Sequence, residues 1–241
     1  ISRMVDAGRV RLTLELGGSD PMIVCGDADL DRAVAGAVAG RFYNCGQICT
    51  AVKRLFVADS VADGFTERLK AATERLRVGD GAVEGTDIGP LNSSEGLHRI
   101  ERMVEDSTGS AKVITGARRP EGRGNFYAPT LITDLEPDSR LLTEEVFGPV
   151  LPIVRFGDLD EAIEMANSTR FGLGASIWTN DMRNASKAVD GVKSGILWVN
   201  RHSRIPPEVP FRGVKGSGIG RENGQNALDG YLVEKTVIIS P

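Results

Sequence analysis

Short apolar runs alternate along this chain with longer stretches whose apolar residues recur at helical spacing. The runs predict strands at 21–25, 54–57, 112–114, 130–132, 150–154, 175–178 and 196–199. The helical stretches are 29–38, 60–76, 93–107, 159–167 and 182–192, with Ser60 as a good N-cap and Gly79 as a terminator of the second. Such alternation is typical of an α/β protein with a largely parallel sheet flanked by helices.

The composition of the chain limits the kinds of molecule that it is expected to bind. The 241 residues suffice for one large domain or two small ones, and a net charge of -4 gives no basic footprint for nucleic acid or an anionic membrane. No apolar run approaches the roughly 20 residues of a spanning helix, and the N-terminus lacks a secretory h-region. Three cysteines form no disulfide framework. We expect a soluble, cytoplasmic protein with a small-molecule substrate.

Four motifs carry the chemistry. Glu15 lies in Leu14-Glu15-Leu16-Gly17-Gly18, and Cys49 ends the run Asn44-Cys45-Gly46-Gln47-Ile48-Cys49. Glu144-Glu145-Val146-Phe147-Gly148-Pro149 and Pro210-Phe211-Arg212-Gly213 follow downstream. Each motif is weak alone, but their order and spacing resemble the second half of the aldehyde dehydrogenase superfamily, from about Leu12 to the end of the chain.

The resemblance makes Cys49 the nucleophile and Glu15 the general base. An aldehyde carbon cannot release hydride until a nucleophile has made it tetrahedral, and a thiolate serves this purpose well. The expected sequence is a thiohemiacetal, hydride transfer to NAD or NADP, a thioester, and its hydrolysis to a carboxylic acid. Glu15 would activate the hydrolytic water.

The resemblance also implies cofactor contacts. It assigns Glu145 to the nicotinamide ribose and Phe147 to the nicotinamide ring, while Gly17 allows close backbone approach. Because no G-x-G-x-x-G follows a predicted strand, we expect most of the cofactor site to lie outside this chain. The chain would then be a catalytic fragment, inactive as a dehydrogenase by itself.

Three parts are expected. Residues 1–17 would end a cofactor-binding domain, 18–218 would form the catalytic domain, and 219–241 would form a tail. The β-rich segment Tyr231–Ile239 is a pairing hazard if left uncovered. We predict that it pairs with another subunit's sheet in a homodimer or homotetramer.

The substrate is less constrained. Residues Glu15–Pro21 resemble the succinate-semialdehyde and short-chain branch, some members of which place a carboxylate-binding Arg six positions before the nucleophile. That position is Tyr43 here, and Arg212 replaces a Gly of the family's pattern. Arg41, Arg201 and Arg204 are candidates for an anionic substrate, although solvated surface positions are commoner for arginine.

Two other functions remain open. A Cys–His acyl hydrolase would need His98 or His202 near Cys49, whereas a non-catalytic oligomerisation fragment would retain the motifs without activity. No metal site is expected, because only Cys45 lies near Cys49 as a second ligand. Cys25 and Cys45 are interpreted as packing residues, and Asn44 as structural.

Overall fold

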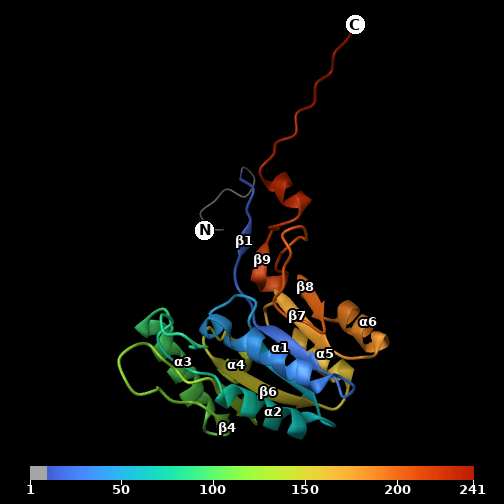
Figure 1. Cartoon of the computed structure of the whole chain (residues 1–241). Coiled ribbons are helices and arrows are strands. Elements are labelled where there is room, and N and C mark those ends of the chain that lie inside the picture. The colour runs from blue at the N-terminus through green and yellow to red at the C-terminus, as the bar shows by residue number, and fades with distance from the viewer. Residues whose placement is uncertain (1–9) are drawn as a thin grey trace.

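The computed structural model describes residues 10–241, and a seven-stranded sheet forms its centre (Figure 1). The strands lie in the order β4-β5-β6-β3-β2-β7-β8. Neighbours pair in parallel except β4 and β5, which are antiparallel. The strands are β2 (Asp20–Val24), β3 (Val52–Ala58), β4 (Lys112–Thr115), β5 (Thr130–Thr133), β6 (Val150–Phe156), β7 (Gly174–Trp178) and β8 (Ile196–Val199). The predicted α/β fold is confirmed.

Helices cover both faces of this sheet. The helices α1, α2, α3 and α4 pack on one apolar core, and α5 and α6 pack on a second core across the sheet. Their bounds are α1 (Leu30–Phe42), α2 (Ala62–Glu74), α3 (Ser94–Ser107), α4 (Arg140–Thr143), α5 (Leu159–Asn167) and α6 (Met182–Gly191). The loops that precede β2, β3 and β6 lie at the same end of the sheet, because these three strands are parallel.

Local capping explains where the helices begin. The Asp29 side chain accepts from the Arg32 amide at 3.1 Å, and the Ser93 hydroxyl accepts from the Gly96 amide at 3.1 Å, so each satisfies a free N–H of the first turn. The prediction for Ser60 was wrong. Helix α2 begins after Val61, which makes no side-chain cap, and it ends at Glu74, before Gly79.

Strand β3 lies at the middle of the sheet, and all seven of its residues are buried. It nevertheless carries two adjacent cations, Lys53 and Arg54, because consecutive side chains of a strand point to opposite faces. Each face of the sheet therefore contains one buried cation.

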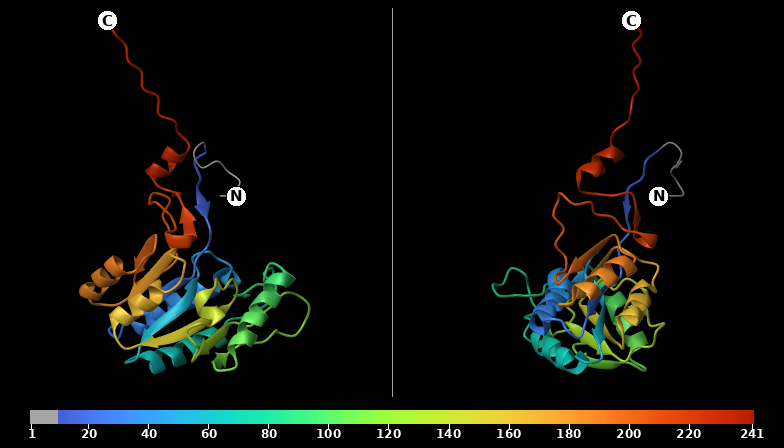
Figure 2. Two further views of the ribbon diagram at one scale, coloured as in Figure 1. Left: turned by 180° about the vertical axis from the view of Figure 1, so that it is seen from behind. Right: turned by 90° about the vertical axis from the view of Figure 1, so that its right-hand side faces the viewer.

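A second, two-stranded sheet lies beyond the main one. It pairs β1 (Leu14–Glu15) with β9 (Gly218–Ile219) in antiparallel fashion, and Figure 2 shows this arm leading away from the helices toward η3 (Gln225–Gly230). Residues 231–241 form no helix or strand and are exposed. The predicted intersubunit pairing of Tyr231–Ile239 stays a prediction. No helix in the described part of the chain is long and apolar enough to cross a membrane.

Candidate active site

Cys49 lies in a loop that joins α1 to β3. After α1 the chain enters η1 (Tyr43–Gly46), where Asn44, Cys45 and Gly46 have φ of 50°, 58° and 72°. The side-chain amide of Asn44 donates to the Gln47 backbone carbonyl at 3.1 Å, and the side-chain amide of Gln47 donates to the Asn44 backbone carbonyl at 3.2 Å. These bonds hold the turn and give Asn44 the structural role expected of it. We call residues 46–50 the nucleophile loop.

Cys49 is the most accessible of the three thiols. Its side chain is half-buried, whereas Cys25 and Cys45 are buried and burial raises the pKa of each to about 11. Burial also raises the pKa of Cys49, and the charge of Glu15 adds to this effect. The ammonium of Lys53 opposes both. The charge of Glu15 thus acts on the thiol, while the roles of nucleophile and general base stay predictions.

Glu15 is presented by the small sheet. Its partner in the ladder is Gly218, and the neighbouring Leu16 amide donates to the Ser217 carbonyl at 3.0 Å. The Glu15 side chain is exposed, and its Oε1 accepts from the Gly17 amide at 2.9 Å. Its other oxygen, Oε2, accepts no hydrogen bond from the residues that the structure describes. The carboxylate is therefore oriented but accessible to water.

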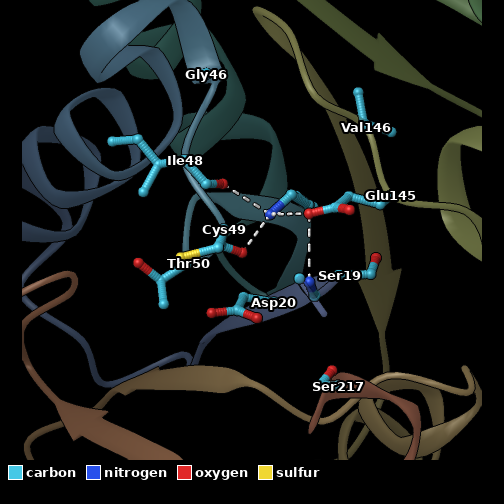
Figure 3. Close-up of polar contacts among 12 residues, drawn as sticks. Ser19, Asp20, Gly46, Ile48, Cys49, Thr50, Glu145, Val146 and Ser217 are labelled. Carbon is cyan, nitrogen blue, oxygen red and sulfur yellow. Dashed lines mark hydrogen bonds and ion pairs between the residues drawn. The ribbon is translucent and has the colours of Figure 1, made fainter. Parts of the chain in front are cut away.

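Glu145 joins the first motif to the third. Its Oε1 accepts from the Gly18 amide at 3.3 Å and lies 3.5 Å from the Lys53 ammonium nitrogen (Figure 3). Gly17 packs against the same carboxylate and has a φ of +74°. Phe147, two residues on, is 41% exposed. The residues that the sequence assigned to the cofactor are thus gathered beside the nucleophile loop.

Two buried cations, Arg41 and Lys53, hold these loops, and the burial of neither was expected from the sequence. Arg41 was considered as a surface or anion-binding residue, but its side chain is fully buried. It donates to the carbonyls of Gly46, Val146 and Gly148 and thereby bridges the nucleophile loop and the Glu145 loop. Arg41 continues the buried face of α1 through Ala33 and Ala37, a spacing that could have revealed its burial.

The structure also places the other candidate arginines and Arg212. Arg201 and Arg204 are exposed. Arg212 replaces the family's glycine without strain, because it is not among the residues with positive φ.

Asp20 is a buried carboxylate close to the same centre. Its Oδ1 accepts from the Gly174 amide at 3.0 Å, and burial raises its pKa to about 6. Lys53 and Arg54 oppose this shift. Burial in turn lowers the pKa of Lys53, which Asp20 partly restores. Asp20, Lys53 and Arg54 therefore form a network of interacting buried charges near Cys49.

His202 lies near the nucleophile loop, where a Cys–His hydrolase would need it. Its Nε2 is 2.7 Å from the Thr50 carbonyl oxygen, and its Nδ1 is 2.9 Å from the Ser176 hydroxyl. A carbonyl can only accept, so Nε2 carries the proton and Nδ1 accepts from Ser176. Burial lowers the pKa of His202 to about 4. Both ring nitrogens are engaged, which disfavours His202 as the base for Cys49. The other histidine, His98, is exposed on α3.

Among residues 10–241, no group of three or more His, Cys, Asp or Glu side chains could hold a metal ion.

Comparisons with known proteins agree with this geometry. The model of the "Aldehyde dehydrogenase family" matches residues 1–237. Succinate-semialdehyde dehydrogenase [NADP(+)] 1 of Mycobacterium tuberculosis is 44% identical over 94% of this chain and 50% of its own length. Betaine aldehyde dehydrogenase of Rhizobium leguminosarum is 40% identical over 97% of this chain and 49% of its own. The chain spans about half the length of the curated relatives it matches.

Solved structures give the same result. The NAD-dependent aldehyde dehydrogenase of Sinorhizobium meliloti superposes with a TM-score of 0.92 at 36% identity, covering 95% of this chain and 46% of that one. Betaine aldehyde dehydrogenase of Staphylococcus aureus in complex with NAD+ superposes with a TM-score of 0.89 at 35% identity, covering 92% and 45%. The chain belongs to the aldehyde dehydrogenase family.

Proposed function

We propose that this chain carries the catalytic cysteine and general base of an NAD(P)-dependent oxidation of a small aldehyde to a carboxylic acid. The observation that carries the proposal is the convergence of Cys49, Glu15 and Glu145 from three separate motifs. A thiol beside a water-accessible carboxylate suits acyl transfer followed by hydrolysis.

The reaction on this chain begins with the thiolate of Cys49. Its sulfur attacks the aldehyde carbon and forms a thiohemiacetal, whose oxyanion the Cys49 amide would stabilise. That carbon would then give up its hydride, for which a nicotinamide, when bound, would supply the acceptor. The remaining thioester is attacked by water, Glu15 takes the water's proton, and the acid leaves as the thiol is restored.

The residues present fit a nicotinamide ribose. Glu145 has its Oε1 held by Gly18 and Lys53, while Oε2 accepts no hydrogen bond from the residues that the structure describes. A carboxylate oxygen is a suitable acceptor for a ribose hydroxyl. Gly17 leaves space beside it that a Cβ would fill, at 2.6 Å from both oxygens. We infer that Glu145 and Gly17 contact the ribose and that Phe147 flanks the nicotinamide ring.

The relatives offer candidates for the cofactor, NAD or NADP, and for the aldehyde. The mycobacterial relative is named for NADP+ and succinate semialdehyde, whereas the staphylococcal structure contains NAD+ and is named for betaine aldehyde. Tyr43, which stands where some of the branch carry an arginine, is 73% exposed. We further propose that residues 18–218 form the catalytic part, between the end of a cofactor-binding part at 1–17 and an oligomerisation tail at 219–241.

An activated ester tests the nucleophile without a cofactor, because it delivers the same acyl group to a thiol. Intact-mass spectrometry of the chain after brief exposure to such an ester should show one acyl group, and peptide mapping should place it on Cys49. Cys49→Ala should abolish this adduct and Cys45→Ala should keep most of it. Equal loss in both variants would contradict the assignment, and loss in His202→Gln alone would favour the hydrolase.

Oxidation itself is tested by joining this chain to the preceding half of the mycobacterial relative. Aldehyde-dependent reduction of NAD+ or NADP+, lost in Cys49→Ala, is expected. Assays with an anionic and a cationic aldehyde would show which end group the Tyr43 side of the site accepts. Cofactor reduction that survived Cys49→Ala unchanged would overturn the proposal.

A further inference from the structure

Lys53 is a buried cation whose ammonium contacts three different parts of the site. Its Nζ donates to the Ile48 carbonyl at 3.0 Å and to the Cys49 carbonyl at 2.5 Å, and it lies 3.5 Å from Oε1 of Glu145. Figure 3 draws these three contacts as dashed lines to Ile48, Cys49 and Glu145. An ammonium has three N–H donors and no acceptor. Lys53 thus makes two hydrogen bonds to backbone carbonyls of the nucleophile loop and one ion pair with the carboxylate of Glu145.

We propose that Lys53 is a positioning residue that joins the nucleophile loop to the carboxylate of Glu145. The inference rests on the proposed function, because it assigns Lys53 a part in placing the acyl-transfer thiol relative to the ribose carboxylate. The hydrogen bonds of Lys53 go to backbone carbonyls and its ion pair to a carboxylate, and none of them goes to the Cys49 thiol. Lys53 acts through the backbone of Ile48 and Cys49 and through the side chain of Glu145.

The burial of Lys53 shows that its contacts are specific. Its side chain has 0% exposure, against 24% for Glu145. Taking an ammonium out of water is costly unless it is paired and fully hydrogen-bonded. A buried methionine would fill the same space without that cost. The retained charge at this position thus has a use that packing alone does not supply.

The ion pair with Glu145 involves only one of its two carboxylate oxygens. Lys53 and the Gly18 amide both contact Oε1, which fixes the side chain at one end. Oε2 accepts no hydrogen bond from the residues that the structure describes. Lys53 also places a positive charge next to Cys49, and this charge lowers the pKa of the thiol against the opposing effects of burial and Glu15.

Arg54 supplies a matched control on the same strand. It is equally buried, but it faces the other side of the sheet and donates to the carbonyls of Ser19, Met165 and Ala166. None of these oxygens belongs to the nucleophile loop or to Glu145. Arg54→Met therefore removes a buried cation from β3 without removing the link that Lys53 makes.

The first experiment measures the alkylation rate of Cys49 as a function of pH, with peptide mapping to separate the three thiols. Lys53→Met should move the midpoint to higher pH and slow alkylation severalfold at neutral pH. Lys53→Arg and Arg54→Met should stay near the parent. If Lys53 had a merely structural role, Lys53→Met would shift the midpoint to lower pH instead. Loosening the loop would expose the thiol and speed alkylation. That result, or an unchanged profile, would overturn the proposal.

The second experiment tests the link to Glu145 by a double-mutant cycle on the urea midpoint. Glu145→Gln should lower the midpoint in the parent and change it much less in the Lys53→Met background. Equal shifts in both backgrounds would show that the two residues act independently and would refute the link. Both experiments are separate from the acylation assay. If Cys49→Ala kept its acyl adduct while the Lys53 results held, the proposed function would fail and the link would stand.

Discussion

A Cβ atom on Gly17 would lie 2.6 Å from both carboxylate oxygens of Glu145. Such an approach is closer than any side chain tolerates, so the hydrogen of glycine is what lets the two motifs meet. Gly17 also has a φ of +74°, a conformation that L-residues seldom adopt. The close approach of the Glu145 carboxylate thus requires a glycine at position 17, two residues after the predicted general base Glu15.

Gly17→Ala should lower the free energy of unfolding by more than about 1 kcal/mol, since it adds backbone strain to the displacement of Glu145. Urea denaturation measures the change. Gly64→Ala is the control, because Gly64 lies in α2 with nothing within 4 Å of an added Cβ. That variant should be more stable by roughly 0.5–1 kcal/mol. Similar losses in both variants would argue against a tight contact between Gly17 and Glu145.

Glu15→Gln should change two rates in opposite directions. The charge of Glu15 raises the pKa of Cys49, so its removal should lower that pKa and speed alkylation at neutral pH. The same variant lacks the base for hydrolysis, so the acyl adduct should persist about a hundredfold or more longer. Time-resolved intact-mass measurements give both rates. An adduct as short-lived as that of the parent would remove Glu15 from the hydrolytic step.

His202 should make the fold less stable in acid. An unfolded histidine titrates near pH 6.5, whereas the folded pKa is about 4, so the unfolded chain binds the proton more readily between these values. The contribution of His202 is fully present above about pH 6.5 and is lost as pH falls toward 4, at most about 3 kcal/mol. Urea titrations at pH 7 and pH 4.5 should show a larger loss in the parent than in His202→Gln.

Asp20 should make the fold more stable in acid, which is the opposite of the effect of His202. Its pKa is raised from 3.8 to about 6 in the fold, so its contribution is present below about pH 3.8 and is lost as pH rises through 6. Asp20→Asn should therefore steepen the acid-side loss of stability that His202 causes. A shallower dependence in Asp20→Asn would show that the carboxyl is ionised in the folded chain across this range.

The tail offers a prediction about assembly. Tyr231, Val233, Ile238 and Ile239 are each more than four-fifths exposed, at 83%, 90%, 87% and 87%. An extended apolar segment of this kind favours pairing with a strand edge of another copy. Removing residues 231–241 should reduce the mass measured by light scattering, while thermal unfolding of the remainder stays close to the parent. An unchanged oligomer would contradict the intersubunit role.

The periodicity of the sequence was sufficient for the main sheet and for most helices. Strand β3 was predicted from Arg54–Val57 and extends from Val52 to Ala58, because apolar runs reveal the middle of a buried strand better than its charged start. Helix α2 was predicted to begin at Ser60 on cap preference alone, and the structure begins it without a side-chain cap. Cap preference is weak evidence when a turn precedes the helix.

The candidate site was predicted from ordered motifs, and the structure brings Cys49, Glu15, Glu145 and Gly17 together. Sequence reasoning did not find Lys53 or Asp20 and did not expect Arg41 to be buried, because charged residues are usually exposed. It also missed how His202 is used. Its partners, Thr50 and Ser176, are on segments that only the folded sheet makes adjacent.

The ladder between β1 and β9 pairs segments from opposite ends of the described chain through two residues on each side. We expect so short a ladder to open more readily than the main sheet, because few bonds offset the entropy of closing so large a loop. Glu15 belongs to this ladder, whereas Cys49 is anchored to the central sheet by β3. Local opening would thus withdraw the base and leave the nucleophile in place. Amide hydrogen exchange at Leu16, faster than in β3, would report that motion.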